Sequence, residues 1–402
     1  ESWQAAGWKQ VAEWIAEDIV AGKSMSDAPL PNWVFDGREG VHAAEGSYSP
    51  SRNAKLPRSS LPVYQRQRFP DPLLGEKFAP GETVFENDGL RMWHDGDGIA
   101  VVSFKTKMNT VSDHVLDGLQ ECVTRAEKDF QGLVIWQQKE PFSAGADLAG
   151  ALGLLQAGKV DQFEAMVHNF QRTSQRIKYS LVPVVAAVRG LALGGGCEFQ
   201  MHSAKTVAFL ESYIGLVEAG VGLLPAGGGL KELAVRASQA AGPGGDVFAE
   251  LKKTFETVAM AKVSASAVEA KELGLVRAGD KVAFNAYELL HIAKQEALAL
   301  AETGYRPPLP ARRIQVAGDV GIATFKMMLV NMLEGRFISP YDYEIAERIA
   351  TVLCGGEVDR GALVDEEWLL RLEREHFVAL AQMPKTQERI AYMLKNGKPL
   401  RN

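Results

Sequence analysis

The sequence predicts an α/β protein in which a layered core, residues 81–300, lies between a proline-rich leader, residues 1–80, and a helical tail, residues 301–402. Three observations predict this division. In the middle of the chain, short apolar segments rich in β-branched residues alternate with amphipathic helical patterns, as in α/β layers. The first 80 residues hold eight of the 18 prolines. The residues after 300 show helical periodicity alone.

The leader opens with a helical pattern and is then broken by its prolines. The helical pattern is carried by Trp8, Val11, Trp14, Ile15 and Ile19. Because proline interrupts helices and sheet interiors, we expect the leader to have no compact core of its own. Four of the seven tryptophans lie in its first 33 residues, and we expect them to pack on the rest of the protein or on another domain.

The core is expected to contain buried strands and the tail only helices. Apolar, β-branched runs predict strands at 99–104, 133–137, 184–188 and 206–210. Between the second and third strands, an amphipathic helix presents one apolar face from Phe163 to Ile177. In the tail, periodic segments predict helices at 322–333, 343–353 and 363–380.

Composition excludes several classes of function. The chain carries 44 basic and 50 acidic residues, a formal net charge of −6, whereas general nucleic-acid binding needs a basic surface. No uninterrupted apolar run approaches the roughly 18 residues of a membrane span. Three scattered cysteines do not make a disulfide framework or a zinc cluster, so we expect no metal and a reducing, cytoplasmic compartment.

Two glycine-rich turns follow predicted strands and are the first candidates for chemistry. The SAGAD turn, residues 143–147, comes after the 133–137 strand, and the triple-glycine turn, GLALGGGCE at 190–198, comes after the 184–188 strand. Where a strand gives way to a helix, the first backbone N–H groups lack partners and carry the positive end of the helix dipole. Two such N–H groups converging on one point would form an oxyanion hole.

Other glycine-rich sites fit less well. A Walker loop needs Lys-Ser or Lys-Thr where this chain has Gly196-Cys197. No G-x-G-x-x-G follows a strand, so the sequence supports no nicotinamide or flavin site within this chain. A triple glycine alone is also compatible with a tight turn.

Two glutamates strengthen the interpretation of these turns as a catalytic site. Glu198 directly follows the triple glycine, and Glu218 comes 20 residues later in an apolar, glycine-rich segment, residues 214–229. Either one alone is more often a capping or structural group. A carboxylate in so apolar a stretch is costly to bury unless it is paired or functional, and two beside an oxyanion hole suggest a general acid and base.

Taken together, these motifs resemble the crotonase, or enoyl-CoA hydratase, superfamily from about Glu82 to Gly279. In order along the chain, the matching segments are KMNTVS at 107–112, the SAGAD turn, GLALGGGCE, the segment 215–229 and VEAKELGLV at 268–276. The resemblance implies the crotonase, ClpP-like fold, a spiral of ββα units, here with an added all-helical C-terminal region. A further segment, 242–263, is an insertion relative to short members and is expected to be helical.

The resemblance also implies roles for individual residues. The backbone N–H groups of Ala146 and Gly195 would bind the thioester oxygen of an acyl-CoA. Glu198 and Glu218 fall on the family's two catalytic glutamates, and having both favours hydration of a trans-2-enoyl-CoA to a 3-hydroxyacyl-CoA. The residues expected to lie along coenzyme A are Lys107, Met108, Ala144, Gly145, Asp147 and Gly194. Coenzyme A would enter as part of the substrate, and no other cofactor is expected in this chain.

The flanking segments resemble bacterial β-oxidation fusions in which a 3-hydroxyacyl-CoA dehydrogenase precedes the hydratase. The first eight residues, from Glu1 to Trp8, resemble the end of that dehydrogenase's helical domain, and the chain does not begin with Met. We therefore expect an upstream dehydrogenase domain, which would be the part that uses NAD. Crotonases usually form trimers or pairs of trimers, and the additions at both ends could cover that surface.

Three functions remain open on sequence alone. The first is an enoyl-CoA hydratase of fatty-acid β-oxidation. The second is another crotonase reaction, above all delta-isomerisation of an enoyl-CoA, with Glu218 as the only working base. The third is a non-catalytic module that keeps the fold in order to assemble a β-oxidation complex.

Overall fold

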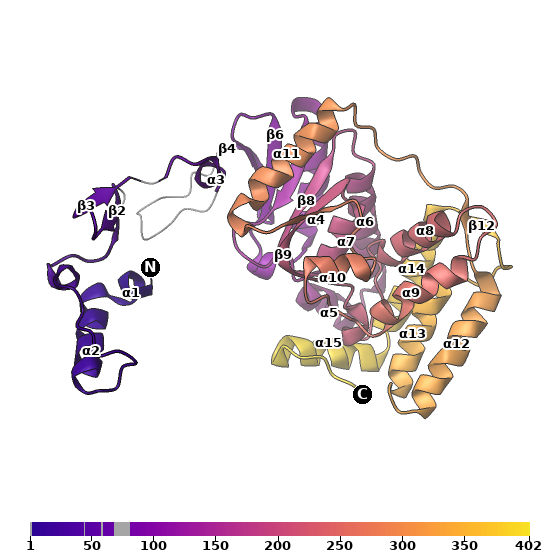
Figure 1. Ribbon diagram of the computed structural model, residues 1–402. Helices are drawn as coiled ribbons and strands as arrows, with labels where there is room; N and C mark the ends of the chain where they lie inside the picture. Colours follow the sequence, from indigo (N-terminus) through magenta and orange to yellow (C-terminus); the bar gives the residue numbers. More distant parts are fainter. Residues whose placement is uncertain (1, 44, 58, 68–80) are drawn as a thin grey trace. The chain divides into compact units, whose positions relative to one another are not determined.

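The computed structural model describes residues 2–43, 45–57, 59–67 and 81–402 (Figure 1). It divides the chain into two compact units, residues 1–80 and 81–402. The tail that we predict from residue 301 thus belongs to the same unit as the core. The last part of the predicted leader, residues 68–80, lies outside the described residues.

The first unit has a small core of its own, so the prediction that prolines prevent one is wrong. Trp8, Ala12 and Val34 are buried together, and the Trp8 indole N–H donates to the Val34 carbonyl at 2.9 Å. The Trp8 ring lies 5.4 Å from Trp3 and 6.1 Å from Trp33, so these tryptophans pack on one another. A few large rings cover enough apolar area to join the helix before the first proline to the segment around Trp33.

Short elements surround this cluster in the first unit. Its helices and strands are α1 (Ser2–Ala6), α2 (Trp8–Val20), η1 (Asn32–Phe35), β1 (His42–Ala43), β2 (Gly46–Ser49), β3 (Ala54–Leu56) and α3 (Pro62–Gln65). The three strands form one antiparallel sheet in the order β1-β2-β3.

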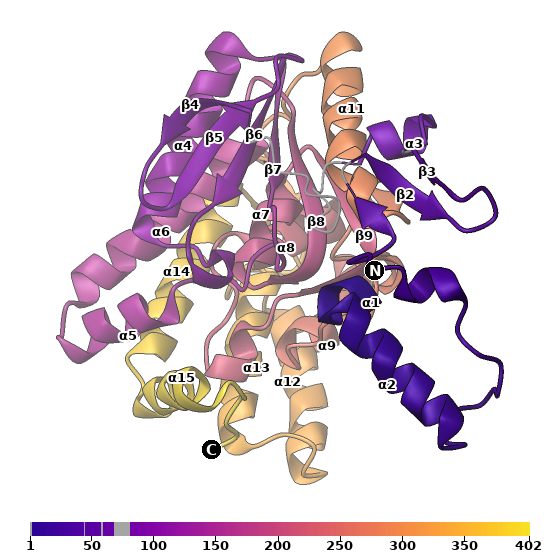
Figure 2. The same cartoon turned by 90° about the vertical axis from the view of Figure 1, so that its left-hand side faces the viewer.

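The second unit is built on a seven-stranded sheet with the order β10-β9-β8-β7-β6-β5-β4 (Figure 2). Its strands are β4 (Glu82–Glu86), β5 (Leu90–His94), β6 (Ile99–Phe104), β7 (Gly132–Trp136), β8 (Val184–Leu193), β9 (Lys205–Gly215) and β10 (Lys281–Ala283). The ladders from β6 to β10 are parallel, and those joining β4, β5 and β6 are antiparallel. All four predicted strands are present, whereas β4, β5 and β10 are additional because polar residues interrupt their apolar pattern.

Two of the predicted strands extend further than the apolar runs indicate. The ladder between β8 and β9 shifts register between Val188 and Gly190 and then continues from Gly190–Ser212 to Leu193–Gly215. Gly190 has φ of +65°, a conformation that favours glycine. Arg189 and Gly190 end the β-branched run, so the sequence pattern stops where the strand only bends.

Helices cover both faces of the sheet, and the helices of the tail pack on some of them. Two of them, α4 and α11, lie on opposite faces of the sheet (Figures 1 and 2). The helices up to residue 302 are α4 (Asp113–Asp129), α5 (Leu148–Gln156), α6 (Val160–Lys178), α7 (Gly195–His202), α8 (Gly229–Ala241), α9 (Val247–Ala259), α10 (Ala267–Glu272) and α11 (Leu289–Glu302). The predicted helix at 163–177 is confirmed as part of α6, and the helical insertion is confirmed as α9.

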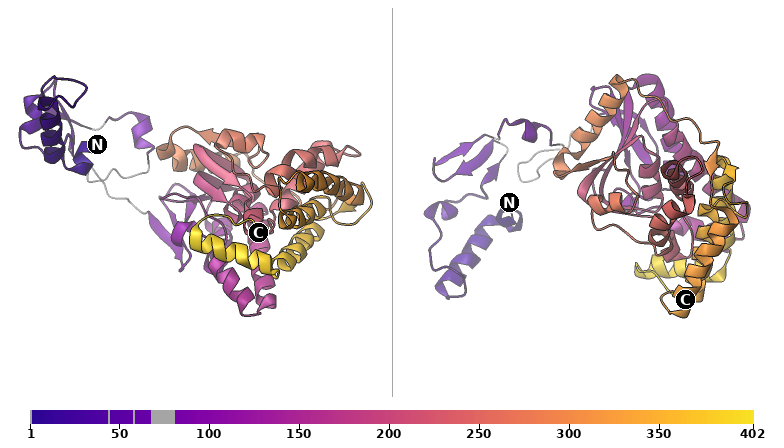
Figure 3. Two further views of the ribbon diagram at one scale, coloured as in Figure 1. Left: turned by 90° about the horizontal axis from the view of Figure 1, so that it is seen from below. Right: turned by 45° about the vertical axis from the view of Figure 1, so that its right-hand side comes forward.

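The tail contains four helices and one short ladder. The helices are α12 (Gly318–Glu334), α13 (Pro340–Leu353), α14 (Glu366–Ala381) and α15 (Pro384–Asn396), and α15 packs beside α5 (Figure 3). The prediction of helices only misses β11 (Ile314–Gln315) and β12 (Leu363–Val364), which pair antiparallel. No helix in the described part of the chain has the length and apolar character that a membrane crossing requires.

One aromatic cluster joins the insertion helix to the tail, and its loss should lower stability. Phe325 of α12 is fully buried, with ring centroids 4.0 Å from Phe255 and 4.7 Å from Phe248 of α9. We expect Phe325→Ala to lower the free energy of unfolding by about 3–5 kcal/mol, measured by urea denaturation. Met327→Ala, on the exposed face of the same helix, is the control and should change it by less than about 0.5 kcal/mol. Equal effects of the two substitutions would contradict this packing.

Candidate active site

The two glycine-rich turns lie side by side at the end of β8. Backbone hydrogen bonds join them: the Ser143 N–H donates to the Leu191 carbonyl at 3.0 Å, and the Leu193 N–H donates to the Ser143 carbonyl at 3.0 Å. The bent extension of β8 is therefore what brings the SAGAD turn to the triple-glycine turn. The chain then enters α7 at Gly195.

Close approach of these turns requires glycine. Gly145 has φ of +95°, and a Cβ atom there would lie 2.9 Å from the Leu193 carbonyl oxygen and 3.6 Å from the Gly195 nitrogen. Gly194, with φ of +53°, donates its own N–H to the Gly215 carbonyl at 2.8 Å. Larger side chains would force the two turns apart.

The two predicted oxyanion donors are brought to this junction. Gly195 is the first residue of α7, so its N–H has no acceptor within the helix, and Ala146 directly follows Gly145. Within the described ranges, neither the Ala146 nor the Gly195 N–H donates to another residue. Ala146 is also an exposed residue. The junction has the donors that an oxyanion hole needs.

Glu198 is buried in α7 and held by a glycine loop, residues 227–229. Its Oε1 accepts hydrogen bonds from the Gly227 N–H at 2.7 Å and the Gly229 N–H at 2.8 Å. A Cβ atom at Gly227 would lie 2.4 Å from the Glu198 Oε2, so glycine is needed there too. Burial raises the pKa of Glu198 to about 7, although the two N–H groups and the Lys231 charge act in the opposite direction.

Glu218 begins the 3₁₀ turn η4 (Glu218–Val221) that follows β9. A Cβ atom at Gly194 would lie 3.1 Å from the Glu218 Oε1, so this carboxyl group reaches the start of α7. Its Oε2 is buried and accepts no hydrogen bond from the described residues. Burial, followed by the negative charge of Glu198, raises the pKa of Glu218 well above its usual range.

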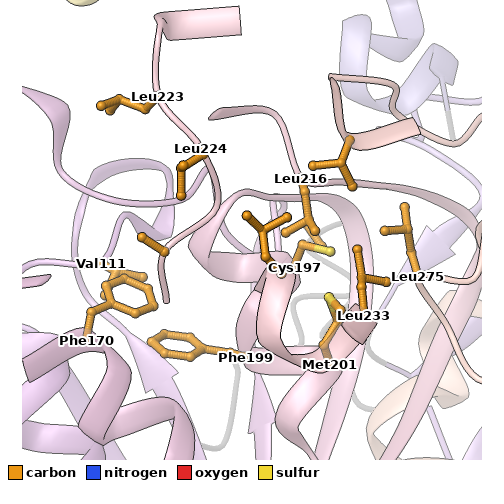
Figure 4. Packing of buried hydrophobic residues seen from close by; sticks show 14 of the residues in the cluster. Val111, Phe170, Cys197, Phe199, Met201, Leu216, Leu223, Leu224, Leu233 and Leu275 are labelled. Atoms are coloured by element: carbon orange, nitrogen blue, oxygen red, sulfur yellow. The ribbon is translucent and has the colours of Figure 1, made fainter. Parts of the chain in front are cut away.

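Apolar side chains line the region beside the Glu198 carboxyl group. A Cβ atom at Gly195 would lie 2.4 Å from Phe170 Cζ, and one at Gly227 would lie 2.6 Å from Phe170 Cδ1. The Phe170 ring thus packs against both the triple-glycine turn and the glycine loop, stacked on Phe199 at 5.0 Å. Figure 4 shows these two rings with Val111 in one apolar cluster. A carboxyl group beside these apolar side chains is poorly solvated, which is why burial is the largest influence on the pKa of Glu198 and raises it.

The residues expected along coenzyme A lie within the SAGAD turn or in segments next to it. Met108, in the turn η3 (Lys107–Asn109), has φ of +56°, and its carbonyl accepts the Ala144 N–H at 3.2 Å. The Lys107 side chain is exposed, whereas the Asp147 carboxylate caps α5 by accepting from the Ala149 and Gly150 N–H groups. In the part of the chain that the structure describes, no group of three or more His, Cys, Asp or Glu residues could hold a metal ion.

The tail supplies contacts to both glutamate segments, and sequence analysis missed them. Thr386 of α15 donates its hydroxyl to the Gly222 carbonyl at 2.6 Å, directly after the turn that carries Glu218. Glu373 of α14 accepts the Gly228 N–H at 2.9 Å, within the loop that holds Glu198. The partners lie more than 140 residues apart in the chain, so no local motif indicates these contacts.

The raised pKa of Glu198 predicts a pH-dependent gain in stability when its charge is removed. The folded state keeps the Glu198 proton between about pH 4.5 and pH 7, where the unfolded chain loses it, so this group makes folding less favourable as the pH rises. Glu198→Gln keeps an oxygen that can accept both N–H groups. We expect urea denaturation to show a gain in unfolding free energy at pH 8 on the order of 2 kcal/mol, and little gain at pH 4.5.

The exposed Glu211 offers a control for this measurement, since Glu211→Gln should leave the unfolding free energy unchanged at both pH values. A gain for Glu198→Gln that is the same at both pH values would contradict the assignment of a raised pKa.

Comparison with known proteins places this geometry in a family. The family described as enoyl-CoA hydratase/isomerase matches residues 94–301, a little over half of the chain. A probable 3-hydroxyacyl-CoA dehydrogenase of Bacillus subtilis is 36% identical over 405 residues, covering 100% of this chain and 49% of that protein. A putative fatty acid oxidation complex trifunctional enzyme of Rickettsia felis is 29% identical over 366 residues, covering 88% and 46%.

The chain thus spans about half the length of these curated relatives. Among solved structures, an enoyl-CoA hydratase from Bacillus halodurans aligns with a TM-score of 0.49 and 16% identity, covering 78% of this chain and 99% of that one. The family match covers more than half of the chain, and the chain belongs to the enoyl-CoA hydratase/isomerase family.

Proposed function

We propose that this chain is an enoyl-CoA hydratase that adds water to a trans-2-enoyl-CoA and gives a 3-hydroxyacyl-CoA. The observation that carries the proposal is a pair of carboxyl groups, the buried Glu198 and the half-buried Glu218 with its shielded Oε2, beside the N–H groups of Ala146 and Gly195, which have no acceptor among the described residues. Hydration of a conjugated thioester needs an acid, a base and stabilisation of an enolate oxygen. This junction offers all three.

The different surroundings of the two glutamates support distinct roles. Glu198, with a pKa of about 7, is partly ionised at neutral pH and can accept a proton from water. Glu218, whose pKa is raised by burial and by the nearby charge of Glu198, would hold a proton and donate it. In the proposed step the water oxygen bonds to C3 as Glu198 takes its proton, Glu218 protonates C2, and proton transfer from Glu198 to Glu218 restores both groups.

The oxyanion donors would act while charge builds on the thioester oxygen. As the C2=C3 double bond opens, negative charge moves to that oxygen, and the N–H groups of Ala146 and Gly195 would stabilise it. Losing one such donor typically costs about 2.7–4 kcal/mol of transition-state stabilisation. Lys107, exposed beside the SAGAD turn, would attract the phosphates of coenzyme A, with Met108, Ala144, Gly145, Asp147 and Gly194 lining its path.

Delta-isomerisation is the second candidate, and one observation favours it. The Glu218 Oε2 accepts no hydrogen bond from the described residues, whereas the Glu198 Oε1 already accepts two. A single free carboxylate is enough to move a proton between C4 and C2. The third candidate, a non-catalytic assembly module, does not explain why Glu198 is kept in a costly buried setting and why the buried Glu218 Oε2 lacks a hydrogen-bond partner among the described residues.

We further propose that the hydratase works beside a dehydrogenase part in the whole protein. The names of the curated relatives, a probable 3-hydroxyacyl-CoA dehydrogenase and putative trifunctional enzymes, support this arrangement, and the chain spans about half their length. The 3-hydroxyacyl-CoA made here would be the substrate of that dehydrogenase, which would use NAD. The hydration step itself needs no cofactor beyond the coenzyme A of its substrate.

Glutamine substitutions test the proposed acid and base. We expect Glu198→Gln and Glu218→Gln each to lower kcat for crotonyl-CoA hydration by about 10²- to 10⁴-fold, with binding of the coenzyme A thioester retained. The fall in absorbance of the conjugated enoyl thioester measures the rate, and calorimetry measures binding. Glu211→Gln, an exposed change on β9, should keep the wild-type rate. Full activity of both Glu198→Gln and Glu218→Gln would contradict the proposed roles and favour the non-catalytic assembly module.

The isomerase alternative predicts a different substrate preference in the wild-type chain. We expect hydration of crotonyl-CoA to exceed conversion of a 3-enoyl-CoA to the 2-enoyl isomer, because the proposed site would supply both an acid and a base. Product analysis by mass spectrometry and chromatography separates the two reactions, since only hydration adds the mass of water. Isomerisation without hydration would overturn the hydratase proposal.

A further inference from the structure

Glu373 is a buried carboxylate that the proposed chemistry does not use. It lies in α14 and is fully buried. Its Oε2 accepts the Gly228 N–H at 2.9 Å, and its Oε1 accepts the Lys231 N–H at 2.7 Å. Gln171 of α6 adds a longer contact, 3.4 Å from its Nε2 to Glu373 Oε2. These contacts hold the first turn of α8, and burial raises the pKa of the Glu373 carboxyl group to about 8.

Glu373 and Glu198 accept hydrogen bonds from alternating N–H groups of the same glycine loop. The N–H groups of Gly227 and Gly229 donate to Glu198, and the N–H of Gly228 between them donates to Glu373. Three consecutive amides are therefore divided between two carboxyl groups. Because each amide plane is rigid, fixing the Gly228 N–H restricts the directions available to its two neighbours.

From this interleaving we infer that Glu373 is a positioning residue, which orients the glycine loop so that the Gly227 and Gly229 N–H groups face Glu198. The inference deepens the proposed hydratase function, on which its kinetic readout rests. Without Glu373 the Gly228 N–H would be buried and unpaired, and the loop would gain by turning it toward another acceptor. Glu198 would then lose the hydrogen-bond donors that fix the position of its carboxyl group beside the proposed oxyanion hole.

Glu366 provides a matched control on the same helix. It is also buried, and its carboxylate accepts from Lys178 Nζ at 2.8 Å, Tyr179 Oη at 2.6 Å and Gln175 Nε2 at 2.9 Å. None of these partners belongs to the glycine loop. Glu366→Gln therefore disturbs a buried polar network of similar size without touching the amides that hold Glu198.

The kinetic test compares Glu373→Gln with Glu366→Gln in the full chain. In Glu373→Gln one carboxylate oxygen becomes an NH₂ group, which cannot accept from a backbone N–H. We expect kcat for crotonyl-CoA hydration to fall about 10- to 100-fold with KM changed less than about threefold, since misplacement of a reacting group affects the chemical step. Glu366→Gln should stay within about twofold of the wild-type kcat. Equal losses in both variants would overturn the inference.

A double-mutant cycle separates positioning from general loss of structure. If Glu373 acts through Glu198, then Glu373→Gln should change kcat by less than about twofold when Glu198→Gln is already present. Additive losses in the double variant would show that Glu373 acts independently of Glu198.

Amide hydrogen exchange tests the same contact without any activity. We expect residues 227–229 to exchange at least about tenfold faster in Glu373→Gln, and at the wild-type rate in Glu366→Gln. If Glu373→Gln does not fold, Glu373→Asp keeps a carboxyl group at shorter reach and should give an intermediate increase. Unchanged exchange in the folded variant would overturn the inference, whereas absence of hydration by the wild-type chain would overturn only the proposed function.

Discussion

The arrangement of the site depends on keeping the Glu198 carboxyl group inside the protein. Removing a carboxylate from water is costly, and two backbone N–H groups only partly offset that cost, as the raised pKa shows. The neighbouring features follow from this constraint. Glycine is required at 227 because a Cβ atom would occupy the space of the carboxylate, and Phe170 closes the apolar side.

The segments of the candidate site could be predicted from the sequence because each of them is local. The SAGAD turn, the triple glycine and Glu198 lie within or beside short segments whose composition fixes their backbone. The contact between the two turns was harder to predict, because it depends on the part of β8 after Gly190, where the apolar pattern has ended. Pairing across that bend, and not the motif alone, brings Ala146 to Gly195.

The contribution of the tail could not be predicted for a physical reason. Glu373 lies in the run Arg371-Leu-Glu-Arg-Glu375, which is typical of a solvated helix face, and nothing local marks its third residue as buried. In the leader, by contrast, the sequence pattern was given too much weight, because its prolines led to the wrong prediction that it has no core. Its prolines do break regular structure, but Trp3, Trp8 and Trp33 supply enough contact area for a small core between them.

The Thr386 contact to Gly222 has a consequence for the order of events during synthesis. Both glutamates leave the ribosome long before α14 and α15, yet the segments that carry them are held by residues of those last helices. A nascent chain that ends before residue 366 therefore contains every residue of the proposed chemistry and lacks the braces that set their geometry. The geometry of the candidate site is therefore complete only once these last helices have been made.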